Sequence, residues 1–146
     1  MLKEIPGSIT APKGFKAAGV KAGIKKSGKE DVALIVSEVP ATAAATFTLN
    51  TMAAAPVAVS KEVAAKGQAK AIVVNAGCAN ACTGEQGMAD AREMAAEAAK
   101  ALKVDASEVF VASTGVIGVE LPMDKVKQGI AKAAAELSVA GEKNAG

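Results

Sequence analysis

Residues 71–118, AIVVNAGCANACTGEQGMADAREMAAEAAKALKVDASEVFVASTGVIG, determine the fold class of this chain. They begin with an apolar run of strand length at 71–75, and a loop of small and polar residues follows at 76–84. Apolar residues then recur at helical spacing over about 86–103, before a second apolar run at 109–112. This order of strand, loop, helix and strand predicts a mixed α/β layer structure, in which functional loops lie at the carboxyl ends of strands.

The segments before this unit predict further extended structure. The first thirty residues are rich in Pro and Gly, which predicts extended segments and turns. Residues 32–36 are apolar throughout and predict a central strand that ends before Pro40. Residues 43–48 predict another strand, and 53–59 predict an extended apolar stretch.

Helices are expected at three places. Ser60 is a suitable N-cap for a short helix at 61–66, with Gly67 as its stop signal. A last helix is expected to start near Pro122, because proline suits a first helical position. The apolar stripes that predict the buried faces of the central and last helices are Met88, Ala91, Ala95, Ala98 and Leu102, and Val126, Ile130, Ala133 and Leu137.

Composition and charge limit the classes of function. With 146 residues, 51% of them hydrophobic, we expect residues 1–146 to form a single α/β domain. The net charge is only +2, Arg92 is the one arginine, and Tyr and Trp are absent, so nucleic acid is not an expected partner. The amino terminus lacks the apolar core of a signal peptide, and no stretch is apolar enough to span a bilayer. We therefore expect a cytoplasmic protein without a membrane partner.

The residues available for catalysis are restricted as well. Histidine is absent, which excludes a Ser-His-Asp or Cys-His site from this chain, so a nucleophile would need another base. Cys78 and Cys82 fit neither a disulfide framework nor the Cys-x-x-Cys spacing of zinc and redox sites. We interpret both as small buried residues, with a reactive thiol as the alternative.

The segment 111–118, VASTGVIG, can present backbone N–H groups to an anion. Glycine allows a reacting atom to approach the main chain, and the hydroxyls of Ser113 and Thr114 can donate hydrogen bonds. These features indicate an oxyanion hole. On this motif alone an ordinary turn after a strand remains the alternative, because Gly and Ser are common turn residues.

Several segments together resemble the bifunctional ornithine acetyltransferase and glutamate N-acetyltransferase family of arginine biosynthesis. The combination of Asn-Ala-Cys-Thr-Gly at 80–84 with Ser-Thr-Gly-Val-Ile-Gly at 113–118 is specific. The other matching segments, in order, are Thr10 to Phe15, Asp31 to Val36, Phe47 to Asn50, Ala54 to Val57, Ala71 to Gly84, and Leu121 to Met123.

The resemblance implies the amino-terminal portion of a layered helix-sheet sandwich of the self-processing ornithine acetyltransferase type. In that family one precursor cleaves itself before a threonine, which gives an α chain and a β chain whose first residue is the nucleophile. The chain is thus expected to be an amino-terminal α-chain fragment that pairs with a β chain in a hetero-oligomer. Because the chain ends at Gly146, without the nucleophile, we expect it to be inactive in isolation.

The activity implied is acetyl transfer from N-acetylornithine to glutamate, with no metal or organic cofactor and with acetyl-CoA as a possible co-substrate. The resemblance assigns the catalytic oxyanion hole to Thr114 and Gly115, the same residues that the local motif indicates. An amino-terminal threonine carries its own base, which agrees with a chain that lacks histidine. Two alternatives remain: a self-processing amidase or aminopeptidase of related architecture, and a non-catalytic module that binds a small anion.

Overall fold

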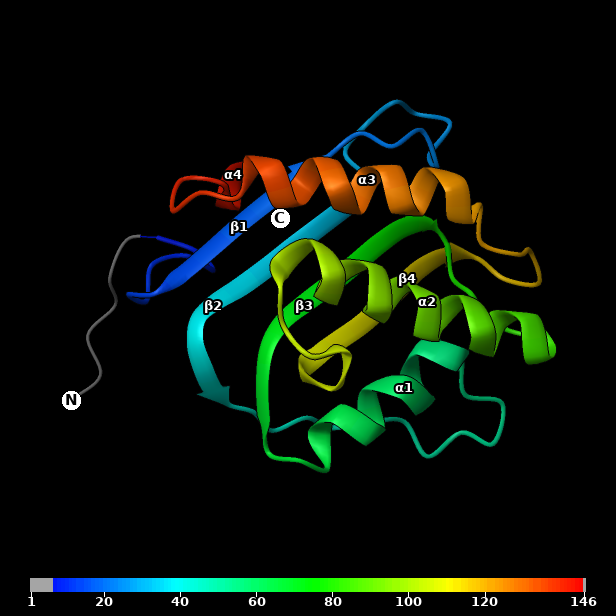
Figure 1. Cartoon of the computed structure of the whole chain (residues 1–146). Helices are drawn as coiled ribbons and strands as arrows, with labels where there is room; N and C mark the ends of the chain where they lie inside the picture. The colour runs from blue at the N-terminus through cyan, green and yellow to red at the C-terminus, as the bar shows by residue number, and fades with distance from the viewer. Residues whose placement is uncertain (1–6, 146) are drawn as a thin grey trace.

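The computed structural model of the chain describes residues 7–145 and contains one four-stranded sheet (Figure 1). Its strands lie in the order β1-β2-β3-β4; β1 and β2, and β2 and β3, are antiparallel, whereas β3 and β4 are parallel. The strands are β1 (Phe15–Val20), β2 (Val32–Thr42), β3 (Gln68–Cys78) and β4 (Val109–Val116). The helices are α1 (Ala55–Ala64), α2 (Gly84–Leu102), the short 3-10 helix η1 (Ala106–Glu108), α3 (Met123–Glu136) and α4 (Glu142–Ala145).

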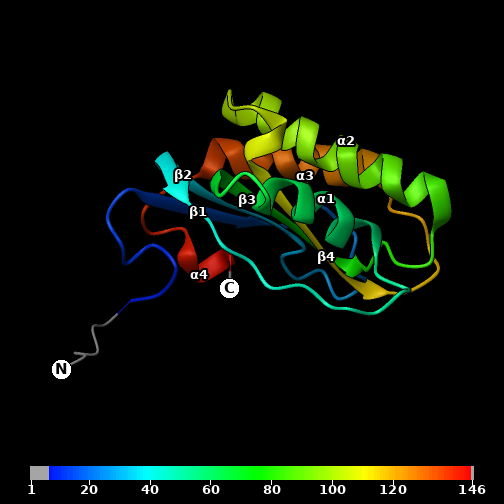
Figure 2. The same ribbon diagram turned by 90° about the horizontal axis from the view of Figure 1, so that it is seen from below.

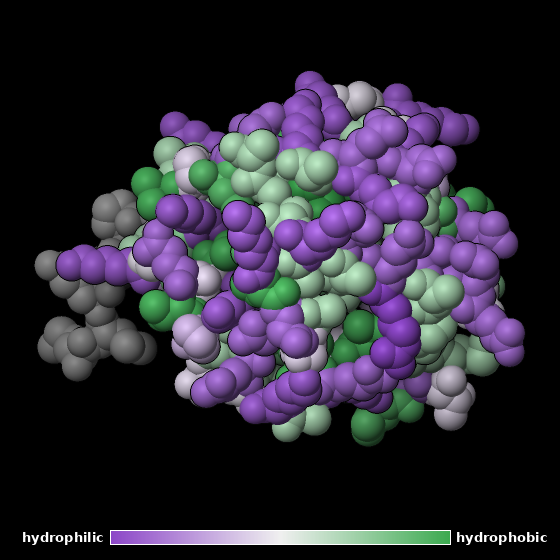
Figure 3. Space-filling model, viewed as in Figure 1, coloured by the Kyte–Doolittle hydropathy of each residue, from purple (hydrophilic) through white to green (hydrophobic). Residues whose placement is uncertain are grey.

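The helices are divided unequally between the two faces of the sheet. Helices α1, α2 and α3 lie together on one face, and only the four-residue α4 lies on the other (Figure 2). Seen from the helical side, the surface is mostly polar (Figure 3). We call the second face, where α4 lies, the open face.

The hydrophobic core lies between the sheet and helices α1 to α3. Its largest fully buried side chains include Leu34 of β2, Val73 of β3, Met94 of α2 and Ile130 of α3. Most of its other members are alanines and valines, so the helices can pack close to the sheet. No helix among residues 7–145 is both long and apolar enough to cross a bilayer.

The open face of β2, β3 and β4 carries an apolar row. Ile35, Ile72 and Phe110 occupy neighbouring positions in the sheet register, and all three are partly exposed. Ile72 is 37% exposed, although it lies in the interior of the sheet. Near the end of the chain, Ser138 pairs with Ala17 at the edge of β1, and α4 packs over this face at β1, where Asn144 contacts Gly19, and also contacts β2.

The sequence predicted the α/β class correctly, together with strands in three of the right places. Residues 32–36 do form a central strand, but β2 continues through Pro40 to Thr42 past an irregularity in the register. A proline is tolerated there because the regular pairing is already interrupted. The segment 15–20, predicted only as extended, pairs with β2 as a regular edge strand.

Two predicted elements before β3 are wrong. Residues 43–48 form no strand, since the chain there runs extended past α1 without sheet pairing. The predicted extended stretch 53–59 belongs mostly to α1, which begins with Pro56 in its first turn. Ser60 is therefore not an N-cap but lies inside the helix and is buried.

The cysteine interpretation is half correct. Cys78 is buried at the end of β3, where its thiol contacts the carbonyl oxygen of Val119 at 3.0 Å. Cys82 is exposed, because it lies in the loop after β3 with φ of 57° and does not enter the core.

Candidate active site

The loop at 76–84 and the segment 113–118, which follow the two predicted strands, meet at one edge of the sheet. Because β3 and β4 are parallel neighbours, their carboxyl ends coincide, and Gly77 lies opposite Gly115. Beyond the strands the loops bond to each other, since the N–H of Ala79 donates to Val116 at 2.9 Å and that of Gly118 donates to Ala81 at 2.8 Å. We call Ser113 to Gly118, with these contacts, the glycine corner.

The geometry of β4 indicates that the backbone N–H of Gly115 is directed to the free edge of the sheet. β4 has a partner strand only on the β3 side, and at Val111 both its N–H and its carbonyl face the other way, to the hydroxyl of Ser60 in α1. Because successive residues of a strand alternate between its two edges, Ser113 and Gly115 also direct their N–H groups outward. The N–H of Thr114 is directed to β3 instead.

Thr114 reaches the surface through its side chain. In β4 the side chains of Val109 and Val111 are buried under the helices, so Phe110, Ala112 and Thr114 lie on the open face. Thr114 and Gly115 are both exposed. The corner can therefore offer one hydroxyl and one backbone N–H to a ligand.

Ser113 faces the opposite side. Its hydroxyl oxygen is buried and has no hydrogen-bond partner, and the same is true of the side-chain oxygen of Asn75, its register neighbour on β3. The serine hydroxyl considered in the motif is thus directed into the helical layer and away from the exposed corner.

Glycine is required at both positions where the strands come closest. Gly115 has φ of 135°, and a Cβ there would overlap the carbonyl carbon of Gly77 and lie 2.6 Å from the nitrogen of Cys78. Gly77 has φ of 114°, and a Cβ there would lie 2.9 Å from the Cγ2 of Ile24. Both φ values lie in a region that other residues rarely adopt, so the corner depends on this pair.

A buried carboxylate lies behind Gly77. Asp31 is 3% exposed and accepts hydrogen bonds from the backbone N–H groups of Ala22 at 2.6 Å, Ile24 at 2.6 Å and Lys25 at 2.9 Å. Burial acts to raise the pKa of Asp31, but the N–H groups of the loop 22–25 outweigh it and hold the pKa below its ordinary value. Sequence reasoning missed this carboxylate; the only local signal is an acidic residue directly before a strand and after a glycine-rich loop.

The loop after β3 is closed by a second set of side chains. Asn80 is fully buried, has φ of 47°, and donates from its amide to the carbonyl of Gly87 at 2.8 Å. The hydroxyl of Thr83 donates to the side-chain oxygen of Asn80 at 2.7 Å. These bonds tie the loop to the first turn of α2 and leave Asn80 and Thr83 in structural roles.

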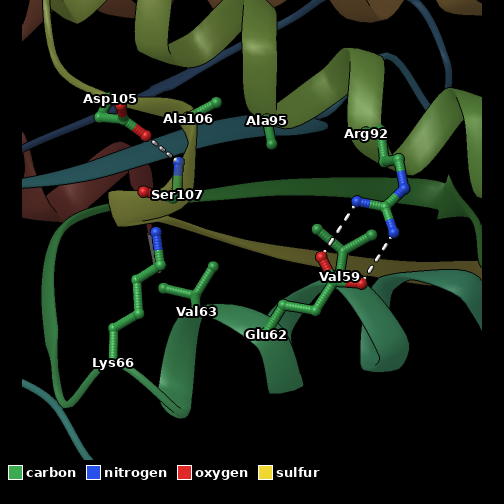
Figure 4. Close-up of a pocket in the computed structure, with 9 residues that line it drawn as sticks. All are labelled: Val59, Glu62, Val63, Lys66, Arg92, Ala95, Asp105, Ala106 and Ser107. Atoms are coloured by element: carbon green, nitrogen blue, oxygen red, sulfur yellow. Dashed lines mark hydrogen bonds and ion pairs between the residues drawn. The ribbon is translucent and has the colours of Figure 1, made fainter.

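A pocket of 340 Å³ lies away from the corner, between α1, α2 and η1 (Figure 4). Arg92 and Glu62 face each other across it as a bidentate pair with bonds of 3.0 and 2.7 Å. Asp105 accepts from the N–H of Ser107 at 2.7 Å, and the Lys66 charge also acts on it. Its charged groups are thus already engaged with one another, which makes it a weaker candidate site than the corner.

Among residues 7–145 no group of three or more Cys, Asp or Glu side chains is arranged to hold a metal ion. The groups available for chemistry at the corner are hydrogen-bond donors, and such donors stabilise negative charge that develops on an oxygen. A family model described as the ArgJ family matches residues 16–145. The chain belongs to the ArgJ family.

ArgJ relatives match nearly the whole chain. The arginine biosynthesis bifunctional protein ArgJ of Caldanaerobacter subterraneus subsp. tengcongensis is 55% identical over 94% of this chain and 34% of its own length. The protein of the same name from Symbiobacterium thermophilum is 54% identical over 94% of this chain and 35% of its own length. The chain therefore spans about a third of the length of these ArgJ proteins.

Solved ArgJ structures share the fold. The chain superposes with a TM-score of 0.90 on the ornithine acetyltransferase of Mycobacterium tuberculosis, solved in complex with ornithine, at 46% identity over 94% of this chain and 75% of that one. ArgJ from Bacillus halodurans gives a TM-score of 0.88 at 43% identity, over 95% of this chain and 73% of that one. The helix-and-sheet layering expected from the resemblance is thus the ArgJ fold.

Proposed function

We propose that this chain is the amino-terminal part of an acetyltransferase that moves an acetyl group from N-acetylornithine to glutamate. Its glycine corner serves as the oxyanion hole, with the N–H of Gly115 and the hydroxyl of Thr114 as the two donors. A second polypeptide segment, the β chain, brings an amino-terminal threonine as nucleophile. Membership of the ArgJ family and the solved complex of a relative with ornithine support this assignment.

The donors act on charge that appears only during the reaction. When the threonine hydroxyl attacks the acetyl carbonyl, the carbonyl oxygen becomes an alkoxide, and its collapse releases ornithine and leaves an acetyl ester on the enzyme. The amine of glutamate then attacks the ester, and a second alkoxide forms before N-acetylglutamate leaves. Each donor aimed at this oxygen contributes about 3 kcal/mol to lowering the barrier.

The single observation that carries the proposal is that Thr114 and Gly115 are both exposed at the end of β4, an edge strand whose N–H at Val111 is directed outward. By the alternation of the strand we infer the same direction for the N–H of Gly115. A backbone donor that the β3–β4 pairing does not use is already oriented before the substrate arrives, so it costs no reorganisation in the transition state. A second polypeptide that covers the apolar open face would also reach Thr114, because Thr114 lies on that face.

The test is acetyl transfer with the Thr114→Val variant in the full-length enzyme. We expect kcat to fall about 100-fold with little change in folding, because valine keeps the shape of threonine and removes only the donor. Thr42→Val is the matched control: Thr42 is also an exposed strand residue, but it lies opposite Gln68, at the other end of the sheet. An unchanged kcat for Thr114→Val would remove this residue from the oxyanion hole.

Two further measurements with the same assay distinguish the acetyltransferase from a related amidase and from a non-catalytic binding module. The 146-residue chain alone should give no turnover, because it has no amino-terminal threonine. In the assembled enzyme, glutamate should discharge the acetyl ester faster than water does, whereas a related amidase would favour water. Binding of N-acetylornithine to the chain without any turnover in the assembled form would instead favour a non-catalytic module.

A further inference from the structure

We propose that Asp31 is a positioning residue for the glycine corner, acting through the loop 22–25 and Gly77. The inference rests on the proposed function, because it concerns the same site. It adds a residue that touches neither substrate nor nucleophile and that lies directly before β2. Three successive contacts carry the argument, each between groups that the structure places in direct contact.

The first contact joins the carboxylate to the loop. One oxygen of Asp31 accepts from Ala22 at 2.6 Å, and the other accepts from Ile24 at 2.6 Å and Lys25 at 2.9 Å. Hydrogen bonds to an ionised acceptor are stronger than neutral ones, and three of them determine the path of a short loop. Gly23 lies in the middle of this loop with φ of 82°, so the loop itself has little intrinsic stiffness.

The second contact joins the loop to β3. Ile24 and Lys25 pack against the Cα of Gly77 so closely that a Cβ there would lie 2.9 Å from the Cγ2 of Ile24 and 3.3 Å from the Cγ of Lys25. Asp31 also accepts at its backbone oxygen from the N–H of Ala76 at 2.8 Å. The residue before Gly77 and the space beside Gly77 are thus both held by Asp31 or its loop.

The third contact joins β3 to the corner. Gly77 and Gly115 are register partners, and the backbone of Gly77 and Cys78 fills the space where a side chain at Gly115 would lie. A shift of the Gly77 backbone therefore displaces Gly115 directly. Since the proposed donor is the N–H of Gly115, its direction depends on this packing, and a misplacement of about 1 Å in a catalytic group can cost about 100-fold in rate.

The experiment compares Asp31→Asn with Glu30→Gln in the full-length enzyme. Glu30 is the neighbouring carboxylate, but it is exposed and its side chain accepts none of the loop bonds. For Asp31→Asn we expect faster hydrogen exchange of the amides at 113–118 and a fall in kcat of about tenfold, with KM for N-acetylornithine changed less than about twofold. Glu30→Gln should leave both exchange and kcat unchanged.

A second variant keeps the proposal testable if Asp31→Asn does not fold. Ile24→Ala retains the Asp31 carboxylate and its bonds but removes the side-chain atom of Ile24 that lies nearest to Gly77. It should change exchange at 113–118 and kcat in the same direction, by a smaller factor. The positioning role would be overturned if a folded variant had the same hydrogen-exchange rates at 113–118, or the same kcat, as the unmodified enzyme.

The outcome is distinguishable from a failure of the proposed function. If Thr114→Val is slow and Asp31→Asn is normal, only the positioning role is wrong. If Thr114→Val is itself normal, Thr114 is not a donor of the oxyanion hole, and a slow Asp31→Asn would still support the positioning of Gly115. If both variants are normal, the positioning role is wrong.

Discussion

At the scale of single residues, Asp31 organises more of the site than its place in the sequence indicates. Its carboxylate is buried and receives its hydrogen bonds from three main-chain N–H groups, so it stabilises the loop 22–25 only while it is ionised. Those bonds hold its pKa below the ordinary value of an aspartate, against the opposite effect of burial.

The stability of the fold should therefore depend on Asp31 in an acid-sensitive way. A carboxyl whose pKa is lower in the folded than in the unfolded state contributes stability above the unfolded pKa, and this is lost as the pH falls through the folded value. We expect Asp31→Asn to lower the free energy of unfolding at pH 7 by about 1 to 3 kcal/mol. The difference in free energy of unfolding between Asp31→Asn and the unmodified chain should become smaller below about pH 4.

Urea unfolding at pH 7 and at pH 3, followed by far-UV circular dichroism, measures both effects. Glu30→Gln, at the exposed neighbour, should show no such difference at either pH. If Asp31→Asn lowered the free energy of unfolding equally at pH 7 and at pH 3, the stabilising role of the ionised Asp31 carboxylate would be contradicted.

The sequence indicated one half of the candidate site. Thr114 and Gly115 could be recognised because hydroxyl and glycine residues after an apolar run form a local pattern. Asp31, Ile24 and Gly77 could not, because their roles depend on which strands become neighbours, and no local pattern carries that information. Their assembly follows from the β1-β2-β3-β4 order of the sheet.

At the scale of elements, one hydroxyl joins α1 to β4. Ser60 donates to the carbonyl of Val111 at 2.8 Å and accepts from its N–H at 3.0 Å, so it satisfies both groups at the free edge of the strand. Sequence reasoning placed Ser60 at the start of a helix, where serine is common. Its role in the interior of α1 depends on the contact between α1 and β4, which the local sequence does not indicate.

We expect Ser60→Ala to destabilise the protein by about 2 to 4 kcal/mol, because it leaves a buried N–H and a buried carbonyl without partners. The measurement is chemical denaturation of the chain. Ser27→Ala, in the exposed loop between β1 and β2, is the control and should change stability by less than about 0.5 kcal/mol. Equal stability of the two variants would show that the edge of β4 finds another partner.

The error at 53–59 has a physical cause. Short apolar runs rich in alanine are compatible with a strand or a helix, and 53–59 became helical because Pro56 fits a first helical turn. By contrast, 71–75 and 109–112 contain β-branched residues and lie in the sheet as predicted. Strand β1 was missed because Gly19 and two alanines lack strand propensity, and pairing with β2 outweighs it.

At the scale of the whole molecule, the two faces of the sheet are unequal. Three helices cover one face, while β3 and β4 present Ile72 and Phe110 on the other. Exposed apolar side chains continue within the corner at Val116 and Ile117 and directly after it at Val119. Contiguous apolar surface of this kind is typical of an interface with another polypeptide.

We therefore expect Ile72→Lys to weaken assembly with the proposed β chain by at least about tenfold, because it places a charge where an isoleucine would be buried. The chain itself should still fold, since Ile72 is 37% exposed without a partner. Sedimentation velocity of the two polypeptides mixed after separate purification measures the affinity. Val39→Lys, at an apolar residue that is already 64% exposed, is the control, and equal affinities for the two variants would exclude the open face as the interface.

The end of β3 and the loop that follows it hold the two thiols of the chain in opposite environments. Cys78 is buried and Cys82 is exposed, so a maleimide dye attaches at one place under native conditions. The chain contains neither Trp nor Tyr, and the emission of such a dye is free of intrinsic background. Since Ala81, the residue before Cys82, accepts a hydrogen bond from Gly118 of the corner, the fluorescence of the label should report directly on a ligand or polypeptide that binds there.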